Sequence, residues 1–145
     1  MLLVVDANRI FSMLLSKGKV FSVFSVNKLL NKFEFIAPEF LFFEIGRHFG
    51  EIVKRSKLSP DELAKTFEFL KEEIDFIPFS EFNKFADEAE QISPHSKDMQ
   101  YFALALSFNC TIWSDEKAFK KQSAVKIFNT DEVIGILRSK LGTAV

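Results

Sequence analysis

Leu2-Leu3-Val4-Val5-Asp6-Ala7-Asn8 is the stretch of sequence that decides the fold of this chain. Its four apolar residues run without a break and end at the carboxylate of Asp6. Such a run is typical of a strand buried on both faces, and therefore of a central strand in a parallel sheet. Ligands of open α/β sheets bind outside the carboxyl ends of the strands, so Asp6 is a candidate site residue. The alternative is that Asp6 only caps the helix that follows.

The composition is that of a globular protein. The chain has 145 residues, of which 48% are apolar, with 19 Phe against one Trp and one Tyr. This length predicts one domain over residues 1–145 with an aromatic core. Because no apolar run could cross a bilayer and the N-terminus does not read as a signal peptide, we expect a cytoplasmic protein. The single Cys110 excludes an internal disulfide and is expected to be a small buried residue.

The net charge of −1 excludes a bulk polycation for nucleic acid, but the charge is unevenly distributed. Residues 1–57 carry nine Lys and Arg against five Asp and Glu, whereas residues 58–145 carry ten against fifteen. The cations of the first part could form one basic face, although an ordinary solvated helix surface is the stronger explanation for most of them. These cations are Arg9, Lys17, Lys19, Lys28, Lys32, Lys54, Arg55 and Lys57.

Strand-like and helical segments alternate along the rest of the chain. Further strands are expected at 33–37, 75–79, 111–113 and 126–128, and helices at 8–16, 20–31, 39–56, 59–73, 81–91, 98–108 and 130–141. Pro78 places the third strand at an edge of the sheet. The alternation predicts an α/β protein with a parallel sheet.

Acidic residues recur where the predicted strands end or helices begin. Asp98 opens a helix, and Asp115 and Glu116 follow the fourth strand. If the first and fourth strands are neighbours, Asp6 comes close to Asp115 or Glu116, and carboxylates packed so closely repel one another. A hard cation such as Mg²⁺ removes this conflict, whereas no His/Cys cluster exists for zinc. Taken singly, Asp98 and Asp115 could serve only as negative charges at helix N-termini.

Four pieces of the chain, in order, resemble the motifs of the PIN domain family. They lie at residues 4–8, 38–45, 98–106 and 112–119. The resemblance implies a three-layer α/β fold with a five-stranded parallel sheet of order 3-2-1-4-5 flanked by helices. It also implies a ribonuclease that depends on Mg²⁺ or Mn²⁺, in many similar proteins the toxin of a toxin–antitoxin pair. By this likeness the metal-site acids are Asp6, Glu44 and Asp98, and the polar supports are Asn8 and Ser114.

Glu44 has an alternative explanation. Its helical neighbours Arg47, His48 and Glu51 form a polar stripe, so Glu44 on its own is better explained as a solvent-exposed charge.

The fourth acid departs from the family pattern, which usually reads Ser or Thr, any residue, then Asp. In this chain Glu116 stands in the acid position and Asp115 in the neutral one. Ser114 is expected to cap a helix starting at Asp115. The two-residue spacing of Ser114 and Glu116 matches that of Asp6 and Asn8 and favours Glu116, but Asp115 lies nearer the strand end and remains a candidate metal ligand.

The resemblance further implies RNA as a partner and a small antitoxin protein as a second. Candidate RNA contacts are Arg9, Arg47, Lys54 and Arg55. We also expect a homodimer, because 19 Phe are more than one small core easily hides and exposed apolar patches mark interfaces. The helices of residues 39–73 offer the longest faces for it.

Other α/β enzymes fit the sequence less well. A haloacid-dehalogenase-type phosphatase needs a second Asp where Asn8 stands, and a receiver domain needs an Asp at the end of its third strand, where Asp75 instead begins one. No glycine-rich phosphate loop is present. The remaining alternative is a PIN-like module that binds RNA or protein without useful catalysis. The displaced fourth acid favours this alternative, whereas the intact Asp6, Glu44 and Asp98 argue against it.

Overall fold

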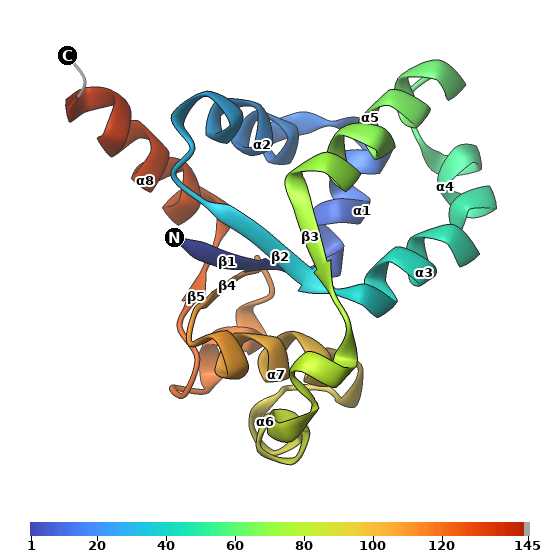
Figure 1. The fold of residues 1–145 in the computed structure, drawn as a ribbon. Coiled ribbons are helices and arrows are strands. Elements are labelled where there is room, and N and C mark those ends of the chain that lie inside the picture. The colour runs from blue at the N-terminus through green and yellow to red at the C-terminus, as the bar shows by residue number, and fades with distance from the viewer. Residues whose placement is uncertain (144–145) are drawn as a thin grey trace.

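The computed structural model describes residues 1–143 and contains one five-stranded parallel sheet of order β3-β2-β1-β4-β5 (Figure 1). The strands are β1 (Leu2–Val5), β2 (Glu34–Pro38), β3 (Ile74–Ile77), β4 (Thr111–Trp113) and β5 (Ile127–Phe128). β1 pairs with β2 on one side and with β4 on the other, so it is the central strand. The predicted fold class and strand order are confirmed, with β3 at an edge.

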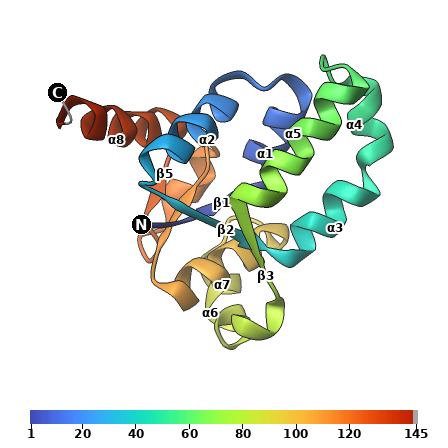
Figure 2. The ribbon, with the colours of Figure 1, turned by 45° about the horizontal axis from the view of Figure 1, so that its top comes forward.

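Helices cover both faces of this sheet (Figures 1 and 2). They are α1 (Ala7–Ser16), α2 (Gly18–Leu30), α3 (Glu39–Arg47), α4 (Phe49–Arg55), α5 (Pro60–Glu73), α6 (Ala86–Ile92), α7 (Met99–Phe108) and α8 (Thr130–Thr143). α7 packs on β1, β2 and β4, whereas α1 and α2 lie on the opposite face, where α2 contacts α8. No helix within residues 1–143 combines the length and the apolar character that a membrane span requires.

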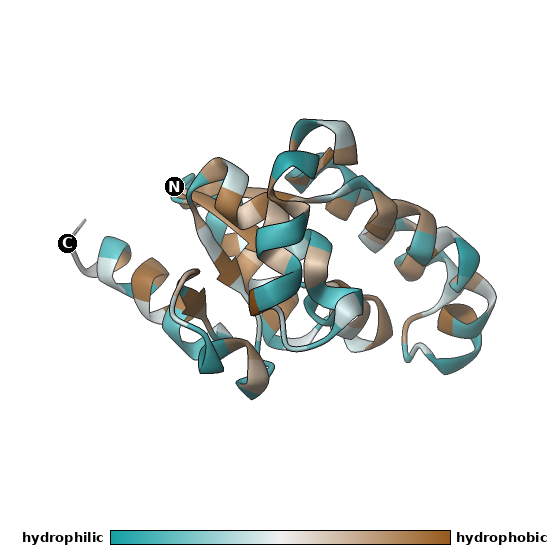
Figure 3. Ribbon diagram, turned by 90° about the horizontal axis from the view of Figure 1, so that it is seen from below, coloured by the Kyte–Doolittle hydropathy of each residue, from teal (hydrophilic) through white to brown (hydrophobic). Residues whose placement is uncertain are grey.

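An aromatic cluster fixes the central strands to α2. The Trp113 ring of β4 lies 5.5 Å from Phe24 of α2 and 5.9 Å from Phe35 of β2, between ring centroids. Leu3, Val4 and Val5 of β1 have no exposed surface, which explains the unbroken apolar run. Figure 3 shows the hydrophobic strands at the centre and both colours alternating along the surrounding helices. The carboxyl ends of β1 and β4 are therefore held rigidly side by side.

Two helix predictions were wrong because packing overrides the local pattern. The expected helix over 39–56 breaks at His48, between α3 and α4, and the break lets Phe42 and Phe49 both contact Phe67 of α5. The helix expected at 81–91 begins only at Ala86, because the chain turns at Phe82 and buries this ring against Phe79.

A third expectation, a helix starting at Asp115, was also wrong. The Ser114 hydroxyl does accept a hydrogen bond from the Glu116 amide at 3.1 Å, but only a short 3₁₀ helix follows, at Lys117–Lys121. The extended backbone at Glu116 carries the chain across the end of β4. Asp115 and Glu116 consequently sit in a turn, where neighbouring side chains can face in opposite directions.

Candidate active site

Asp6 lies where β1 ends and α1 begins, directly beside the end of β4. Its amide donates to the Trp113 carbonyl at 3.1 Å, and its carboxylate Oδ2 accepts from the Ser114 hydroxyl at 2.8 Å. The side chain makes no cap to α1, so the capping explanation does not describe this residue. Asp6 is only 3% exposed, and burial raises its pKa to about 6. The charges of Asp98 and Glu116 add to this rise, while the Ser114 hydrogen bond and Arg9 oppose it.

Asp98 lies at the start of α7, on the other wall of the same pocket. It is 7% exposed, and its Oδ2 atom is buried without a hydrogen-bond partner. Burial raises the pKa of Asp98, and the nearby charge of Glu116 adds to this, whereas Lys97 lowers it. Since a buried carboxylate oxygen without a partner is costly, this atom indicates a group that the protein still has to bind.

One pocket of about 180 Å³ brings together five of the predicted site residues, and we call it the acid pocket. They are Asp6, Asn8, Glu44, Asp98 and Glu116. Phe11, Phe40, Leu41 and Tyr101 form its apolar wall, and Lys97 stands at its side. The pocket thus combines four carboxylates with a largely apolar lining, an arrangement that raises the cost of leaving the charges uncompensated.

Glu44 reaches the acid pocket from α3 but is already engaged there. Its carboxylate pairs with Arg47 through Oε1 and with His48 Nε2 at 3.5 Å through Oε2. The Glu44 side chain is 31% exposed, so it is neither a free surface charge nor a buried one. Helical spacing places both partners, at positions i+3 and i+4, one turn away from Glu44.

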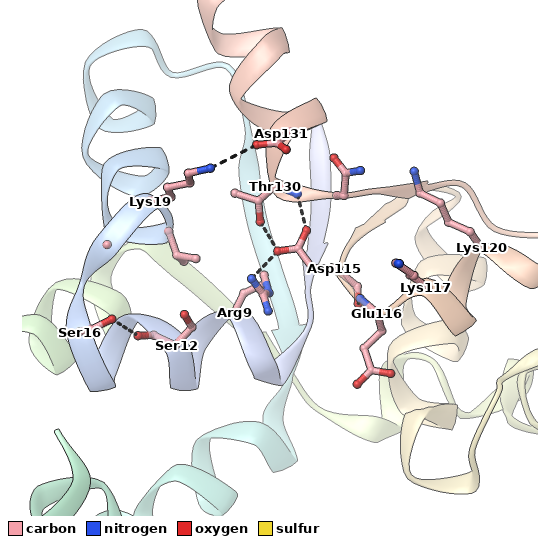
Figure 4. A pocket seen from close by; sticks show the side chains of 14 residues that line it. Arg9, Ser12, Ser16, Lys19, Asp115, Glu116, Lys117, Lys120, Thr130 and Asp131 are labelled. Atoms are coloured by element: carbon pink, nitrogen blue, oxygen red, sulfur yellow. Dashed lines mark hydrogen bonds and ion pairs between the residues drawn. The ribbon is translucent and has the colours of Figure 1, made fainter.

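Asp115 and Glu116 face opposite sides of the turn after β4 (Figure 4). Glu116 points toward the acid pocket and accepts a hydrogen bond from the Asn8 amide group at 3.1 Å. Asp115 instead accepts from the Thr130 amide at 2.6 Å, from the Thr130 hydroxyl at 2.7 Å and from Arg9. Among the acids predicted for the site, Asp115 is therefore the one that does not line the acid pocket.

We call Asp115, Arg9, Thr130 and Trp113 the Asp115 cluster. Trp113 Nε1 donates to the Thr130 hydroxyl at 3.0 Å, and this hydroxyl donates in turn to Asp115. The cluster ties α1, the end of β4 and the start of α8 together. It lines a larger pocket of about 530 Å³ on the other side of Glu116, with Lys19, Lys117 and Lys120 nearby.

The candidate RNA contacts are not gathered at one place. Arg9 is bound to Asp115, and Arg47 is paired with Glu44 beside the acid pocket. Arg55 lines a separate pocket of about 250 Å³ between α1 and α4, with Phe11, His48 and others, and Lys54 is exposed on α4. Cys110 is half-buried and burial raises its pKa to about 11, which does not favour a nucleophile.

Sequence reasoning missed Tyr101, which lines the acid pocket. It lies three residues after Asp98 on α7, so the helical spacing puts both side chains on one face. This spacing was a usable signal, but the apolar run around Tyr101 reads as core. Thr130, which holds Asp115, was also missed because the two residues meet only in the folded sheet.

The carboxylate oxygens of the acid pocket are the kind of ligand that a hard divalent cation prefers, but they lie too far from one another to hold one ion in the present arrangement. All four acids offer carboxylate oxygens, and the unpaired Oδ2 of Asp98 lacks the partner that a cation would supply. Within residues 1–143, however, no three His, Cys, Asp or Glu side chains stand close enough together to hold one ion. The paired Glu44 and the longer Glu116 are the acids that would have to turn.

Comparisons with known proteins agree with this geometry. The family model described as PIN domain matches residues 4–136. No curated protein matches the sequence. Among solved structures, the fold is similar to one titled as the crystal structure of VapBC2 from Rickettsia felis bound to a DNA fragment from their promoter. That match has a TM-score of 0.59 and 15% identity, and it covers 89% of this chain and 98% of that chain.

Proposed function

The chain belongs to the PIN domain family, whose members are generally nucleases, and from this premise we propose that it is a metal-dependent ribonuclease. The observation that carries the proposal is the acid pocket, where two buried carboxylates share one cavity at the ends of β1 and α7 and one carboxylate oxygen has no partner. Structural ion pairs do not leave a buried carboxylate in this condition. We also propose a cytoplasmic location, where an RNA substrate would be present.

The metal ligands of this proposal are Asp6, Glu44, Asp98 and Glu116. Mg²⁺ or Mn²⁺ is the ion that their oxygen atoms suit, and it would supply charge neutralisation and activation of water toward a phosphodiester. The raised pKa values of Asp6 and Asp98 support this assignment, because burial and, to a smaller extent, neighbouring carboxylates disfavour their charged forms, which a bound cation would stabilise.

The chain's own supporting residues have separate tasks in this proposal. The Ser114 hydroxyl orients Asp6 by its hydrogen bond, and the Asn8 amide orients Glu116. Arg47 and His48 hold the Glu44 carboxylate at the edge of the acid pocket, and Glu44 would leave these partners to bind the cation. Asp115 is not assigned to the metal, because Arg9 and Thr130 already occupy both of its oxygens.

Cleavage of a labelled single-stranded RNA panel in Mn²⁺ tests the function. We expect cleavage that EDTA abolishes and that Asp6→Asn, which keeps the shape and removes the charge, reduces by orders of magnitude. Equal cleavage by the variant and the wild type would contradict the proposal. RNA binding without cleavage would support the alternative of an inactive PIN-like module, which the incomplete gathering of the acids favours.

We further propose that the protein is a toxin with a small protein antitoxin, on the strength of its family and of its similarity in fold to VapBC2. Expression of the chain alone is expected to arrest growth, and co-expression of the small reading frame next to its gene should relieve the arrest. Growth arrest that persists in Asp6→Asn would contradict a toxic nuclease.

A homodimer is the second assembly that we propose. Phe43 on α3 is 64% exposed and Val53 on α4 is 44% exposed, so both helices carry exposed apolar side chains. Figure 2 shows α3 and α4 following β2 along one side of the molecule. Such surface is typical of an interface. A dimeric mass in solution at micromolar concentration is expected, and a monomeric mass would refute it.

A further inference from the structure

Two buried polar atoms of opposite kind lack partners in the acid pocket. The Asp98 Oδ2 atom is an acceptor, and the Tyr101 hydroxyl is a donor. Tyr101 is only 2% exposed, so solvent does not satisfy it. The two atoms lie on one face of α7 and yet are not bonded to each other. The cavity therefore has places for two different groups, one that attracts a carboxylate and one that accepts a hydrogen bond.

The Tyr101 phenol keeps its hydrogen under all ordinary conditions. Burial raises its pKa well above the usual value, and the charges of Asp6, Asp98 and Glu44 add to the rise, while the Ala7 amide opposes it in part. These carboxylates are three of the four proposed for the metal, and the phenol lines the same pocket. A cation cannot accept its hydrogen bond, so a bound metal ion alone would leave the phenol hydrogen without an acceptor.

The ring of Tyr101 is fixed, which makes its hydroxyl a positioned donor. It packs edge-on against Phe40 at the start of α3, with ring centroids 5.7 Å apart and planes at 68°. Phe40 also lines the acid pocket. Because the ring cannot swing away from the cavity, the direction of its hydroxyl is set before any ligand arrives.

We propose that Tyr101 is a substrate-binding residue of the acid pocket and that its hydroxyl donates a hydrogen bond to a non-bridging phosphate oxygen of RNA. The inference rests on the proposed ribonuclease function. A phosphate next to a cation satisfies both unpaired atoms at once, since the cation compensates Asp98 and the phosphate oxygen accepts from Tyr101. A hydrogen bond to a charged acceptor is among the stronger ones.

Tyr101→Phe tests the assignment, with Ser93→Ala as the matched control. Ser93 carries another buried hydroxyl without a partner, but it does not line the acid pocket. We measure binding of a labelled single-stranded RNA oligonucleotide with Ca²⁺ in place of Mg²⁺ to suppress turnover. Tyr101→Phe is expected to weaken binding roughly tenfold, whereas Ser93→Ala leaves it unchanged.

Two further measurements separate a phosphate contact from a structural role. The metal-free stability of Tyr101→Phe should stay close to that of the wild type, because the hydrogen of the lost hydroxyl has no acceptor and only the Ala7 amide approaches its oxygen. The affinity for Mn²⁺ alone, measured by calorimetry, should also hold. A clearly less stable variant, or one that loses Mn²⁺ affinity, would overturn the proposal.

Phosphorothioate RNA identifies the acceptor atom. Sulfur in place of the contacted oxygen should weaken binding to the wild type more than to Tyr101→Phe, for one of the two diastereomers only. An equal sulfur effect in both proteins, or equal binding of normal RNA by both, would show the inference wrong while the ribonuclease proposal stands. Absence of RNA binding by the wild type would overturn both.

Discussion

The acid pocket and the Asp115 cluster adjoin at the end of β4, and they differ in whether their carboxylate oxygens have hydrogen-bond partners. Both oxygens of Asp115 accept hydrogen bonds, from Thr130 and from Arg9. In the acid pocket, Asp98 has a buried oxygen with no partner, and the pKa of Asp6 is raised to about 6. Neighbouring residues of the sequence, 115 and 116, thus belong to two regions, one in which folding pairs both oxygens of the carboxylate and one in which a buried carboxylate oxygen stays unpaired.

This difference separates structure from function in physical terms. A partly exposed carboxylate whose two oxygens both accept hydrogen bonds, as those of Asp115 do, stabilises a particular arrangement and has little left to offer a ligand. Buried carboxylates without partners cost stability, and proteins retain such groups at sites that bind or react. We therefore expect substitutions in the Asp115 cluster to act mainly on stability and substitutions in the acid pocket to act mainly on activity.

The largest expected effect is on RNA cleavage. Asp98→Asn should lower the Mn²⁺-dependent rate by about a thousandfold, equivalent to about 4 kcal/mol, because a neutral amide replaces the charge of a proposed metal ligand. Asp115→Asn should stay within a few fold of the wild type at a temperature where it remains folded. Single-turnover rates on one labelled RNA provide the comparison, and similar losses in both variants would erase the distinction between the two regions.

The pH dependence of stability gives the next effect, and its sign is unusual for an acidic residue. Because the pKa of Asp6 is raised from 3.8 to about 6, the folded protein holds a proton between these pH values that the unfolded chain has released. The free energy of unfolding therefore falls as the pH rises through this range, by up to about 3 kcal/mol from Asp6 alone. Stability contributed by the protonated group is complete near pH 4 and lost above pH 6.

Urea unfolding of the metal-free protein at pH 4.5 and pH 7 measures this effect. Asp6→Asn should lack the contribution of Asp6, so its stability should fall less over the same interval and exceed that of the wild type at pH 7. Added Mn²⁺ should restore the wild type at pH 7. If the free energy of unfolding changed with pH in the same way for both proteins, the pKa of Asp6 would not be raised in the folded state.

The sequence was sufficient for the sheet but not for the division between these two regions. The apolar run Leu2–Val5 and the alternation of elements predict a parallel sheet with the first strand at its centre. The resemblance to the PIN domain family supplies the full strand order. Asp115 and Glu116 are both acids at one strand exit, however, and what distinguishes them is Thr130. This residue reaches Asp115 only once β5 has paired with β4.

The other errors have the same origin in contacts made far along the chain. The break at His48 serves the contacts of Phe42 and Phe49 with Phe67, which no local pattern contains. Tyr101 carries the spacing of a site residue relative to Asp98, but its apolar neighbours favour the interpretation as core. Periodicity identifies the face of a helix and does not say whether that face meets a cavity.

A smaller effect is expected on the stability that the Asp115 cluster provides. Asp115→Ala removes three hydrogen bonds and leaves Arg9, whose side chain is only 18% exposed, without its partner. We expect the free energy of unfolding to fall by about 2 kcal/mol. The control is Asp131→Ala, since Asp131 is 84% exposed and lies 3.7 Å from Lys19, a pair worth less than about 0.5 kcal/mol. Equal losses would show that the cluster is an ordinary surface ion pair.

The smallest expected effect decides which acid completes the site. Glu116 faces the acid pocket and is held by Asn8 alone, so it is free to approach a cation. Glu116→Gln should weaken Mn²⁺ binding about tenfold, or 1.4 kcal/mol, since three other acids remain. Asp115→Asn should leave the affinity within about threefold of the wild type, because Asp115 is turned away and its oxygens are occupied. Calorimetric titration of both variants measures this. The reverse result, in which Asp115→Asn loses Mn²⁺ binding and Glu116→Gln binds normally, would assign the metal to Asp115 and require its contacts with Thr130 and Arg9 to open when the ion binds.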